Sequence, residues 1–276
     1  MSGVLRILEL NRSNYYEWKE REPSKQKQRR SEMAELIERI HYDSHEIFGA
    51  PKIAGILRDM GHVLSTKYVG DIMREHGWRA HYISPYTVTT KNSDFTTKLK
   101  NILDRNFKPE SPNAVWVTDI TYVWTHEDGF AYLTSVMDLY SRKIIAWTLS
   151  KTMRVEDVLK CIAEAKGRRD FTHALIIHSD RGSQFTSDDY YKLTKDMTTS
   201  YSRKGNPWDN ACIEAFHALI KREWFKKYRP LNFQQAYHLT FEYIEGFYNT
   251  IRPHSHCGGK SPSQFETQFN FKQLTA

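Results

Sequence analysis

Apolar residues in the first third of the chain recur every three or four positions, which is the spacing of one face of a helix. This pattern predicts three short helices with ordinary start and stop residues. Serine precedes the first and third, proline lies in the first turn of the second, and glycine follows the second and third. The predicted helices are 32–41, capped by Ser31, 50–60, opened by Gly49-Ala50-Pro51, and 66–76, capped by Ser65 or Thr66.

A helix, a short glycine-containing turn and a second helix form the order of a helix-turn-helix unit, whose last helix contacts DNA. Lys67 and Arg74 on the third predicted helix are then the candidate contacts. The alternative is that the three helices simply pack together, because the pattern does not distinguish the two readings. The basic run at 25–30 has two interpretations as well: a phosphate-binding arm or, as we favour, the solvated start of a helix.

From Ala114 onward the apolar pattern changes to that of strands. β-branched and aromatic residues dominate three segments, and an Asp-Gly turn joins the first two. The predicted order is strands at 114–124, 130–138 and 143–149, a helix at 155–162, a strand at 174–178, a short helix at 188–194, a short strand at 200–202, a helix at 209–227 capped by Asp209, and a helix at 232–250. This is the order of a ribonuclease H-like fold, an α/β architecture with a mixed five-stranded sheet and flanking helices.

The change of pattern also divides the chain into parts. Prolines, threonines and lysines with weak periodicity between Ser84 and Pro112 indicate a linker that runs extended over another surface. A small all-α helix-turn-helix domain is therefore expected before the ribonuclease H-like domain. The predicted boundaries are 1–30 for an N-terminal helical and basic arm, 31–80 for the helix-turn-helix-like domain, 81–112 for the linker, 113–250 for the ribonuclease H-like domain and 251–276 for a C-terminal tail.

Charge and cysteine content narrow the possible partners. The 276 residues carry 40 Lys and Arg against 33 Asp and Glu, and the net charge of +7 favours a polyanionic partner such as nucleic acid. The three cysteines have no Cys-x-x-Cys spacing, so neither a disulfide framework nor a thiolate zinc site is expected, and the compartment is reducing. No apolar run is long enough to cross a bilayer. We therefore expect a cytoplasmic, nucleoid-associated protein with no membrane partner.

Three acidic residues are candidates for chemistry. Asp119 interrupts an otherwise buried strand, where an ionised carboxylate is costly unless it is paired or holds a metal. Pairing with Arg142 or Arg181 is the structural alternative. Asp180 follows the fourth strand and Glu214 lies near the start of a later helix, positions that an ordinary turn and an ordinary helix surface would also explain.

The expected fold brings these acids together. In a ribonuclease H-like sheet the first strand is central and the fourth lies beside it, so Asp119 and Asp180 approach each other, and the later helix brings in Glu214. Carboxylate oxygens suit Mg²⁺ or Mn²⁺, which keep several waters and bridge phosphate oxygens. The sequence therefore predicts Asp119, Asp180 and Glu214 as catalytic residues and metal ligands.

Three ordered motifs carry a resemblance to a known family. They are Trp116 to Tyr122 (WVTDITY), His178 to Phe185 (HSDRGSQF), and Ser202 to Ala211 (SRKGNPWDNA) followed by Glu214. Together with Phe48 to Ile53, Tyr248-Asn249, Arg252-Pro253-His254 and Ser261-Pro262, they closely resemble the catalytic, second-frame product of insertion-sequence family three, whose core is similar to retroviral integrase. The match covers most of the chain, and three motifs in order are much harder to meet by chance than one.

The resemblance implies a DNA transposase or integrase that cleaves and transfers DNA strands through a DDE triad, the two aspartates and the glutamate, with two Mg²⁺ or Mn²⁺ ions. It implies double-stranded DNA, both transposon ends and target, as the substrate. A homo-oligomer of at least two subunits is expected because two ends are joined. The family product is often fused by frameshifting to an upstream DNA-recognition part, so an upstream-frame partner or fusion is also expected.

The spacing of the third acid departs from the family pattern. Asp180 and Glu214 are separated by 33 residues. This is about two fewer than is usual, a change that a surface connection tolerates. Glu223 is the only nearby substitute for Glu214, and it lies well down the same predicted helix.

DNA contacts are expected beside the three acids. The basic loop at 203–208 contains glycine and asparagine and suits phosphate binding. Trp208 either stacks on a base or fills the core, and Lys221 shares a helix face with Glu214. His178 either tunes the site or, as we favour, is structural, and Asp138 is interpreted as a turn acid. The predicted nucleic-acid contacts in this domain are Arg203, Lys204, Asn206, Trp208, Asn210 and Lys221.

Two other functions are compatible with the same fold. One is a catalytically silent DNA-binding protein, which the three retained carboxylates disfavour. The other is a metal-dependent nuclease that cuts without joining, which the helix-turn-helix unit disfavours.

Overall fold

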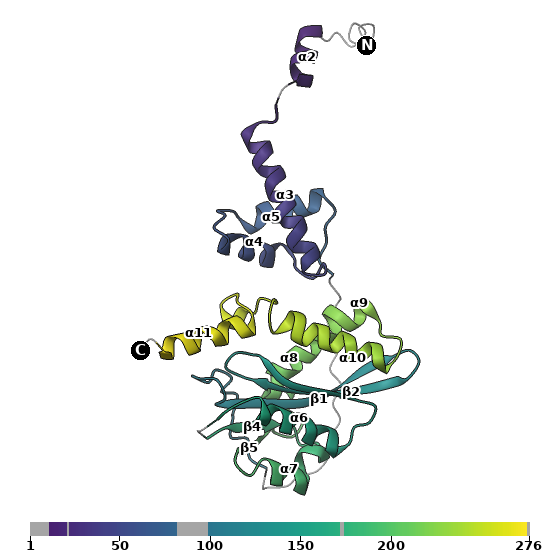
Figure 1. Cartoon of the computed structure of the whole chain (residues 1–276), viewed down its shortest axis with the longest axis vertical. Coiled ribbons are helices and arrows are strands. Elements are labelled where there is room, and N and C mark those ends of the chain that lie inside the picture. The colour runs from purple at the N-terminus through teal and green to yellow at the C-terminus, as the bar shows by residue number, and fades with distance from the viewer. Residues whose placement is uncertain (1–10, 21, 82–98, 172–173, 275–276) are drawn as a thin grey trace. The chain divides into compact units, whose positions relative to one another are not determined.

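The computed structural model describes residues 11–20, 22–81, 99–171 and 174–274 (Figure 1). Contacts within the chain separate a unit that ends at His81 from a unit that begins at Tyr82. The domain boundaries drawn from the sequence stay predictions. Residues 1–10 of the predicted arm and 82–98 of the predicted linker lie outside the described residues.

The first unit holds the three predicted helices, preceded by α2 (Arg12–Glu20). Their apolar faces meet in a small core that includes Ile37, Ile53 and Ile72, all fully buried. The second and third helices begin where the sequence predicts: Pro51 lies in the first turn of α4, and the Ser65 hydroxyl of α5 accepts from the Tyr68 N–H. The three are α3 Lys25–Asp43, α4 Ala50–Asp59 and α5 Thr66–Glu75.

The predicted start of the first helix is wrong. α3 begins at Lys25, and the hydroxyl of Ser24, not of Ser31, accepts the capping bond from the Lys27 N–H. Lys, Gln and Arg are good helix formers, so the basic run continues the helix back to the nearest serine that follows a proline. The run is thus the start of a helix, and Arg30 within it pairs with Glu75 of α5.

The second unit is built on a mixed five-stranded sheet with the order β3-β2-β1-β4-β5. β2 pairs antiparallel with both β1 and β3, whereas β4 runs parallel to β1 and β5 parallel to β4. This is the ribonuclease H-like arrangement, so the predicted fold class is confirmed. The strands are β1 Val115–Thr125, β2 Gly129–Asp138, β3 Ile144–Ser150, β4 Ile176–Ser179 and β5 Thr198–Tyr201.

Helices cover both faces of this sheet (Figure 1). On one face, α6 packs on β2 and β3 and shares a buried core with Trp116 and Ile177. On the other face, α8 and α10 contact β1. The first layer holds α6 Val155–Gly167, η1 Ser183–Thr186 and α7 Asp188–Leu193; the second holds η2 Pro207–Asn210, α8 Ala211–Ile220, η3 Lys221–Phe225, α9 Lys226–Tyr228, α10 Phe233–Phe241 and η4 Glu242–Tyr248, followed by η5 Ser255–Cys257 and α11 Pro262–Leu274.

The two long helices predicted near the C-terminus are composites. The first runs from η2 through α8 into the π-helix η3 and ends in α9, and the second passes from α10 into the π-helix η4. The prediction that Asp209 caps the first helix is wrong, because Asp209 lies inside η2 and no side chain caps α8. Its carboxylate instead binds two arginines, as described below.

The segment after η4 packs on the same sheet. The Asn249 side chain bonds both the N–H and the C=O of Ile144 on the edge strand β3. Arg252 donates two bonds of 2.7 Å to the carboxylate of Glu223 in η3, and the Tyr243 hydroxyl donates to the same group. All three side chains are buried. A residue of the predicted tail therefore holds the helical stretch that contains Glu214.

The Arg252–Glu223 pair yields a stability prediction. Arg252→Ala leaves a buried carboxylate without its cation, which costs about 3–5 kcal/mol of unfolding free energy. Urea unfolding of the full chain, followed by tryptophan fluorescence, measures this loss. The control is Lys192→Ala, which removes an exposed pair with Asp189 and should leave the midpoint nearly unchanged. Equal, small shifts for both variants would contradict a structural role for Arg252.

Candidate active site

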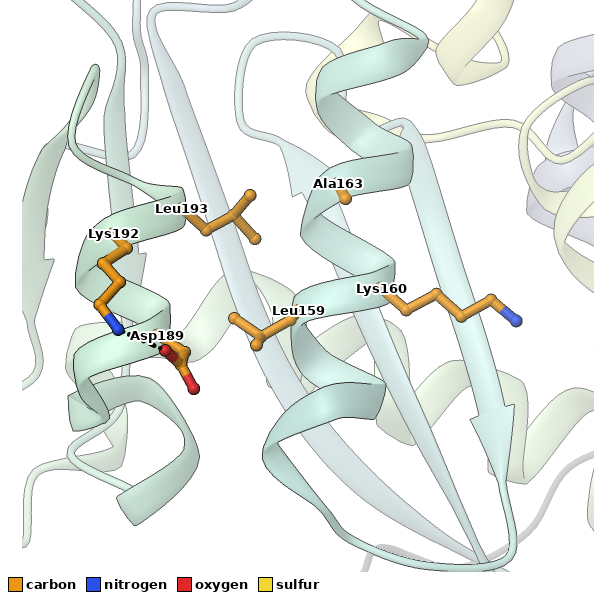
Figure 2. Close-up of a pocket in the computed structure, with 6 residues that line it drawn as sticks. All are labelled: Leu159, Lys160, Ala163, Asp189, Lys192 and Leu193. Atoms are coloured by element: carbon orange, nitrogen blue, oxygen red, sulfur yellow. Dashed lines mark hydrogen bonds and ion pairs between the residues drawn. The ribbon is translucent and has the colours of Figure 1, made fainter.

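The hollow drawn in Figure 2 lies between α6 and α7 and holds about 500 Å³. Leu159, Ala163 and Leu193 supply its apolar walls. Two of its three charged residues pair with each other, because Lys192 donates to Asp189 at 2.9 Å. None of the three predicted catalytic acids lines it, so this hollow is not the candidate active site.

Strand register brings Asp119 and Asp180 together. β1 and β4 pair in parallel, with Val115 opposite Ile176 and Val117 opposite His178. The same offset, continued by two residues, sets Asp119 beside Asp180, which directly follows β4. The central position of β1 in the sheet makes this proximity a consequence of topology.

Glu214 reaches the same place from α8. Ile213, Phe216 and Ile220 are buried and fix the helix on the sheet, while Glu214 stays exposed. At the start of the helix, the Asn210 amide donates to the backbone oxygen of Thr118, the residue before Asp119. One turn after Glu214, Nδ1 of His217 lies 3.4 Å from Oδ2 of Asp119.

Electrostatics show that the three carboxylates share one neighbourhood. Desolvation and then the charge of Asp119 raise the pKa of Asp180 to about 6, against the Gly182 N–H that lowers it. Desolvation, followed by the charges of Asp119 and Asp180, raises the pKa of Glu214 to about 7. The neighbouring negative charges make ionisation of each group harder. A cation between them would remove this repulsion.

The arginines considered as partners for Asp119 are used elsewhere. Arg142 donates to the backbone oxygen of Phe107, and Arg181 donates to the backbone oxygens of Leu99 and Ser202. Neither makes an ion pair with Asp119 in the described part of the chain. Glu223 is excluded as a substitute for Glu214, because Arg252 and Tyr243 occupy its carboxylate.

The donor set fits a divalent cation in its chemistry. Three neighbouring carboxylates supply the oxygen ligands that Mg²⁺ and Mn²⁺ prefer. Among the residues that the structure describes, no three His, Cys, Asp or Glu side chains already stand as a ready-made metal cluster. Asp119 and Asp180 are positioned by strands and Glu214 by a helix, and Asp180 and Glu214 are both exposed to solvent.

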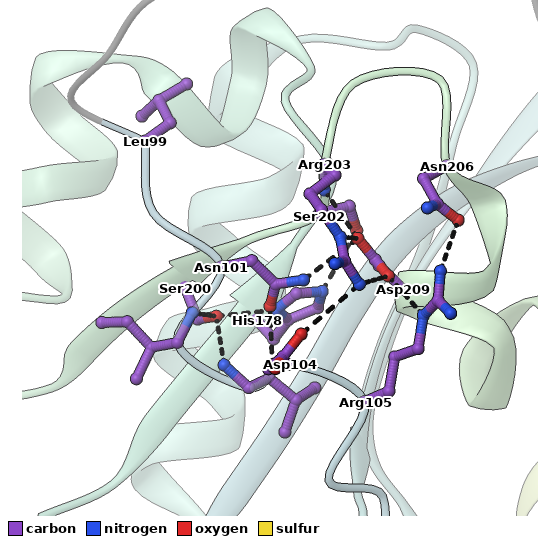
Figure 3. Close-up of polar contacts among 12 residues, drawn as sticks. Leu99, Asn101, Asp104, Arg105, His178, Ser200, Ser202, Arg203, Asn206 and Asp209 are labelled. Carbon is purple, nitrogen blue, oxygen red and sulfur yellow. Dashed lines mark hydrogen bonds and ion pairs between the residues drawn. The ribbon is translucent and has the colours of Figure 1, made fainter.

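A second buried acid holds the start of α8 (Figure 3). The carboxylate of Asp209 has no solvent exposure and accepts bonds from Arg203, Arg105 and Asn101. These bonds hold the pKa of Asp209 far below its usual value, with the Arg203 contribution the largest. Asp209 therefore ties the segment at 101–105 and the basic loop to the helix that carries Glu214.

His178 belongs to the same polar network and is structural. Its two ring nitrogens contact the hydroxyls of Ser200 and Ser202 at 2.8 and 3.1 Å (Figure 3). Burial lowers the pKa of His178 to about 4, so the ring is neutral at physiological pH. Asp138 is structural as well, since it accepts the N–H groups of Asn113 and Tyr140 at the end of β2.

Comparisons with known proteins place the chain in a family. The integrase core domain family matches residues 109–207 and, in a second form, residues 195–262, and the HTH-like domain family matches residues 27–85. The transposase for insertion sequence element IS904 of Lactococcus lactis is 36% identical over 249 residues, which are 89% of this chain and 98% of that protein. The transposase InsF for insertion sequence IS3A of Escherichia coli K12 is 33% identical over 272 residues, 97% of this chain and 94% of that protein. The chain belongs to the IS3 family of transposases.

Among solved structures, this IS3-family transposase is similar to two integrase catalytic cores. One is that of HTLV-2 integrase in complex with magnesium, with 15% identity and a TM-score of 0.44 over 58% of this chain and 99% of that one. The other is that of BIV integrase, with 19% identity and a TM-score of 0.44 over 59% of this chain and 99% of that one. The family membership rests on the transposase relatives.

The predicted DNA contacts of the transposase differ in their surroundings. Trp208 is 70% exposed and therefore does not fill the core, and Lys67 is exposed on α5. Lys221 is partly buried beside Asp119, and desolvation lowers its pKa. Arg74 is exposed and pairs with Asp71. These contacts stay predictions.

The basic loop makes more contacts within the protein than the sequence indicates. The Arg203 guanidinium donates two hydrogen bonds to Asp209, and the Asn206 side-chain oxygen accepts one from Arg105. Lys204 is partly exposed. Asn210 is buried, and its amide donates to Thr118 on β1, which positions the start of α8; its predicted DNA contact stays a prediction. Sequence reasoning missed the contact of His217 with Asp119; the only available signal was its spacing of three from Glu214.

The pKa of Glu214 gives a direct test of the site geometry. Asp180→Asn removes one of the negative charges that disfavour ionisation of Glu214, so the pKa should fall below 7. It should stay above the ordinary 4.5, because desolvation is the larger cause. Carboxyl carbon-13 NMR titration of the metal-free transposase measures it. Asp196→Asn, which alters a carboxylate paired with Lys166, is the control; no difference between the variants would contradict the proximity.

The Asp209 network gives a second test. Asp209→Ala should lower the unfolding free energy less than Arg252→Ala, because the two arginines left behind are about half exposed and can be hydrated. Hydrogen exchange at the start of α8 should become faster while exchange in α6 does not change. Uniform acceleration across both helices would indicate global destabilisation and sink the local positioning role.

Proposed function

We propose that this IS3-family transposase cuts and joins DNA strands with Asp119, Asp180 and Glu214 as its catalytic residues and metal ligands. The observation that carries the proposal is their shared neighbourhood: three carboxylates on a central strand, a strand end and a covering helix, two with raised pKa values. Family membership supports DNA transposition as the overall activity. The triad and its metal dependence are our inference.

Two Mg²⁺ or Mn²⁺ ions, when bound, would supply stabilisation of the attacking and leaving oxygens of an in-line displacement at phosphorus. The residues of the chain provide the frame for this chemistry. Asp119 and Asp180 are fixed by the pairing of β1 with β4. His217 borders the Asp119 carboxylate and Ser135, which limits the positions that Asp119 can take. Lys221 brings a positive charge to the edge of the site, where it suits a DNA phosphate.

The substrate that fits this site is double-stranded DNA, as transposon ends and as target. The two relatives are named as transposases of insertion sequences, and the chain spans nearly their whole length. Asp180 and Glu214 are exposed, so they are accessible to a polymer, and the HTH-like domain supplies a candidate second DNA contact. Joining two ends calls for at least a dimer. An upstream-frame DNA-recognition partner or fusion is part of the same proposal. Among the described residues, no helix is both long and apolar enough to cross a bilayer.

A joining assay separates this function from its alternatives. The full chain is incubated with a labelled transposon-end duplex, a target plasmid and Mn²⁺. Joined product supports a transposase, cleavage without joining supports a nuclease, and unreacted but bound DNA supports a silent binder.

The triad is tested by three substitutions that keep shape and remove charge. Asp119→Asn, Asp180→Asn and Glu214→Gln should each abolish joining and retain most DNA binding, because the lost carboxylates hold metal and not DNA. Glu242→Gln, at an exposed glutamate of η4, is the matched control and should join normally. Joining by the Glu214→Gln protein would remove Glu214 from the triad.

A further inference from the structure

The helical stretch that carries Glu214 ends in a run of cations. Residues 221–229 contain five of them and a single acid, Glu223. Glu223 is buried and pairs closely with Arg252, with a longer contact to Arg222, so it offsets little of the charge at the surface. The cations are Lys221, Arg222, Lys226, Lys227 and Arg229.

Three of these cations face away from the core. Trp224 and Phe225 pack inward, whereas Lys226 and Arg229 are exposed and the Arg222 side chain is 42% exposed. Within the described residues, Lys226 and Arg229 make no ion pair, and the acid beside Arg222 is Glu223 at 3.8 Å. We call Arg222, Lys226 and Arg229 the distal basic surface.

Arg229 is held in a conformation that favours glycine. Its φ of 43° lies in the left-handed region, where a side chain is unfavourable. The turn is fixed from outside, since the N–H groups of His126 and Glu127 at the β1–β2 turn donate to the backbone oxygens of Pro230 and Leu231. Because glycine adopts this conformation freely, replacing Arg229 by glycine removes the side chain without straining the turn.

The distal basic surface lies farther along the helical stretch that carries Glu214. Arg222 and Arg229 follow Glu214 by 8 and 15 residues along one nearly continuous helical stretch. At about 1.5 Å per residue this is roughly 12–22 Å. DNA advances about 3.4 Å per base pair, so the distance equals roughly four to seven base pairs.

We propose that Arg222, Lys226 and Arg229 form a second phosphate-binding surface, which contacts the DNA backbone about four to seven base pairs from the phosphate at the carboxylates. This inference rests on the proposed function, because it concerns the same DNA. The contact is independent of base sequence, since guanidinium and ammonium groups meet phosphate oxygens there. It extends the footprint of the catalytic unit beyond the site that cuts.

Arg229→Gly separates DNA binding from stability. Glycine adopts the left-handed conformation freely, so the melting temperature of the full chain should stay the same or rise. Affinity for a duplex is measured across a salt series without divalent cation, so that the DNA is not cut. The slope of log affinity against log salt should become shallower by about 1 for Arg229→Gly and for Lys226→Ala.

Lys192→Ala on α7 is the matched control, because it also removes one exposed cation. Its salt slope should equal that of the unaltered chain. Slopes unchanged in both Arg229→Gly and Lys226→Ala would overturn the proposal, as would an equal change in the control.

Duplex length tests the reach of the surface. The loss of DNA affinity caused by Arg229→Gly should disappear on a duplex that ends about three base pairs from the reacting phosphate, because this shorter DNA no longer reaches the distal basic surface. Losses that persist on this short duplex would overturn the placement. If the unaltered chain joins DNA but the variants leave the salt slope unchanged, this surface is refuted and the proposed function stands. If the variants alter the slope but the unaltered chain does not join DNA, the surface stands and the proposed function is refuted.

Discussion

Mutual repulsion among Asp119, Asp180 and Glu214 is the constraint on which the rest of the catalytic unit depends. Desolvation, and then the charges of the neighbouring carboxylates, raise the pKa values of Asp180 and Glu214, so both groups resist ionisation. The fold must hold them together against this repulsion in the absence of a cation. It does so with a parallel strand pair whose register is fixed by backbone hydrogen bonds, and with a helix pressed onto the same strand by apolar residues.

The helix of Glu214 is secured at both ends by buried acid–arginine contacts. At the start, Asp209 binds Arg203 and Arg105. Farther along, Glu223 in the π-helix η3 binds Arg252. Each acid is satisfied by several donors, which is the condition under which a buried charge is tolerated. The side chains between these two anchors, including Glu214 and His217, are therefore presented to β1 from a fixed backbone.

The same arrangement buries acidic side chains and leaves basic side chains at the surface. Glu223 and Asp209 are buried with their partners, so the acids of this helical stretch, Glu214 apart, are withdrawn from solvent. The cations near its end remain outside. A surface of this kind attracts phosphate while the carboxylates stay available for metal, which suits an enzyme whose substrate is a polyanion.

Much of the architecture could be predicted from the sequence, because the signals are local. The caps at Pro51 and Ser65 were predicted, and so were the strand that contains Asp119 and the order of elements that gives the sheet. Hydrophobic period, capping and turn chemistry act within a few residues, so they are legible in one dimension. The three motifs then indicated the family. The catalytic role of the three acids in these motifs stays a prediction.

What the tertiary structure alone decided are contacts between residues far apart in the chain. Asp209 was predicted as a helix cap, yet it binds Arg105, about a hundred residues earlier. Glu223 could be excluded as a catalytic residue only once Arg252 was seen on it. The contact of His217 with Asp119 depends on how α8 packs on β1. Such pairings are set by strand register and helix packing, which bring distant residues together with no trace in local sequence. The sequence by itself thus determined the elements, the family and the candidate acids, whereas the tertiary structure decided which charges meet and which face the solvent.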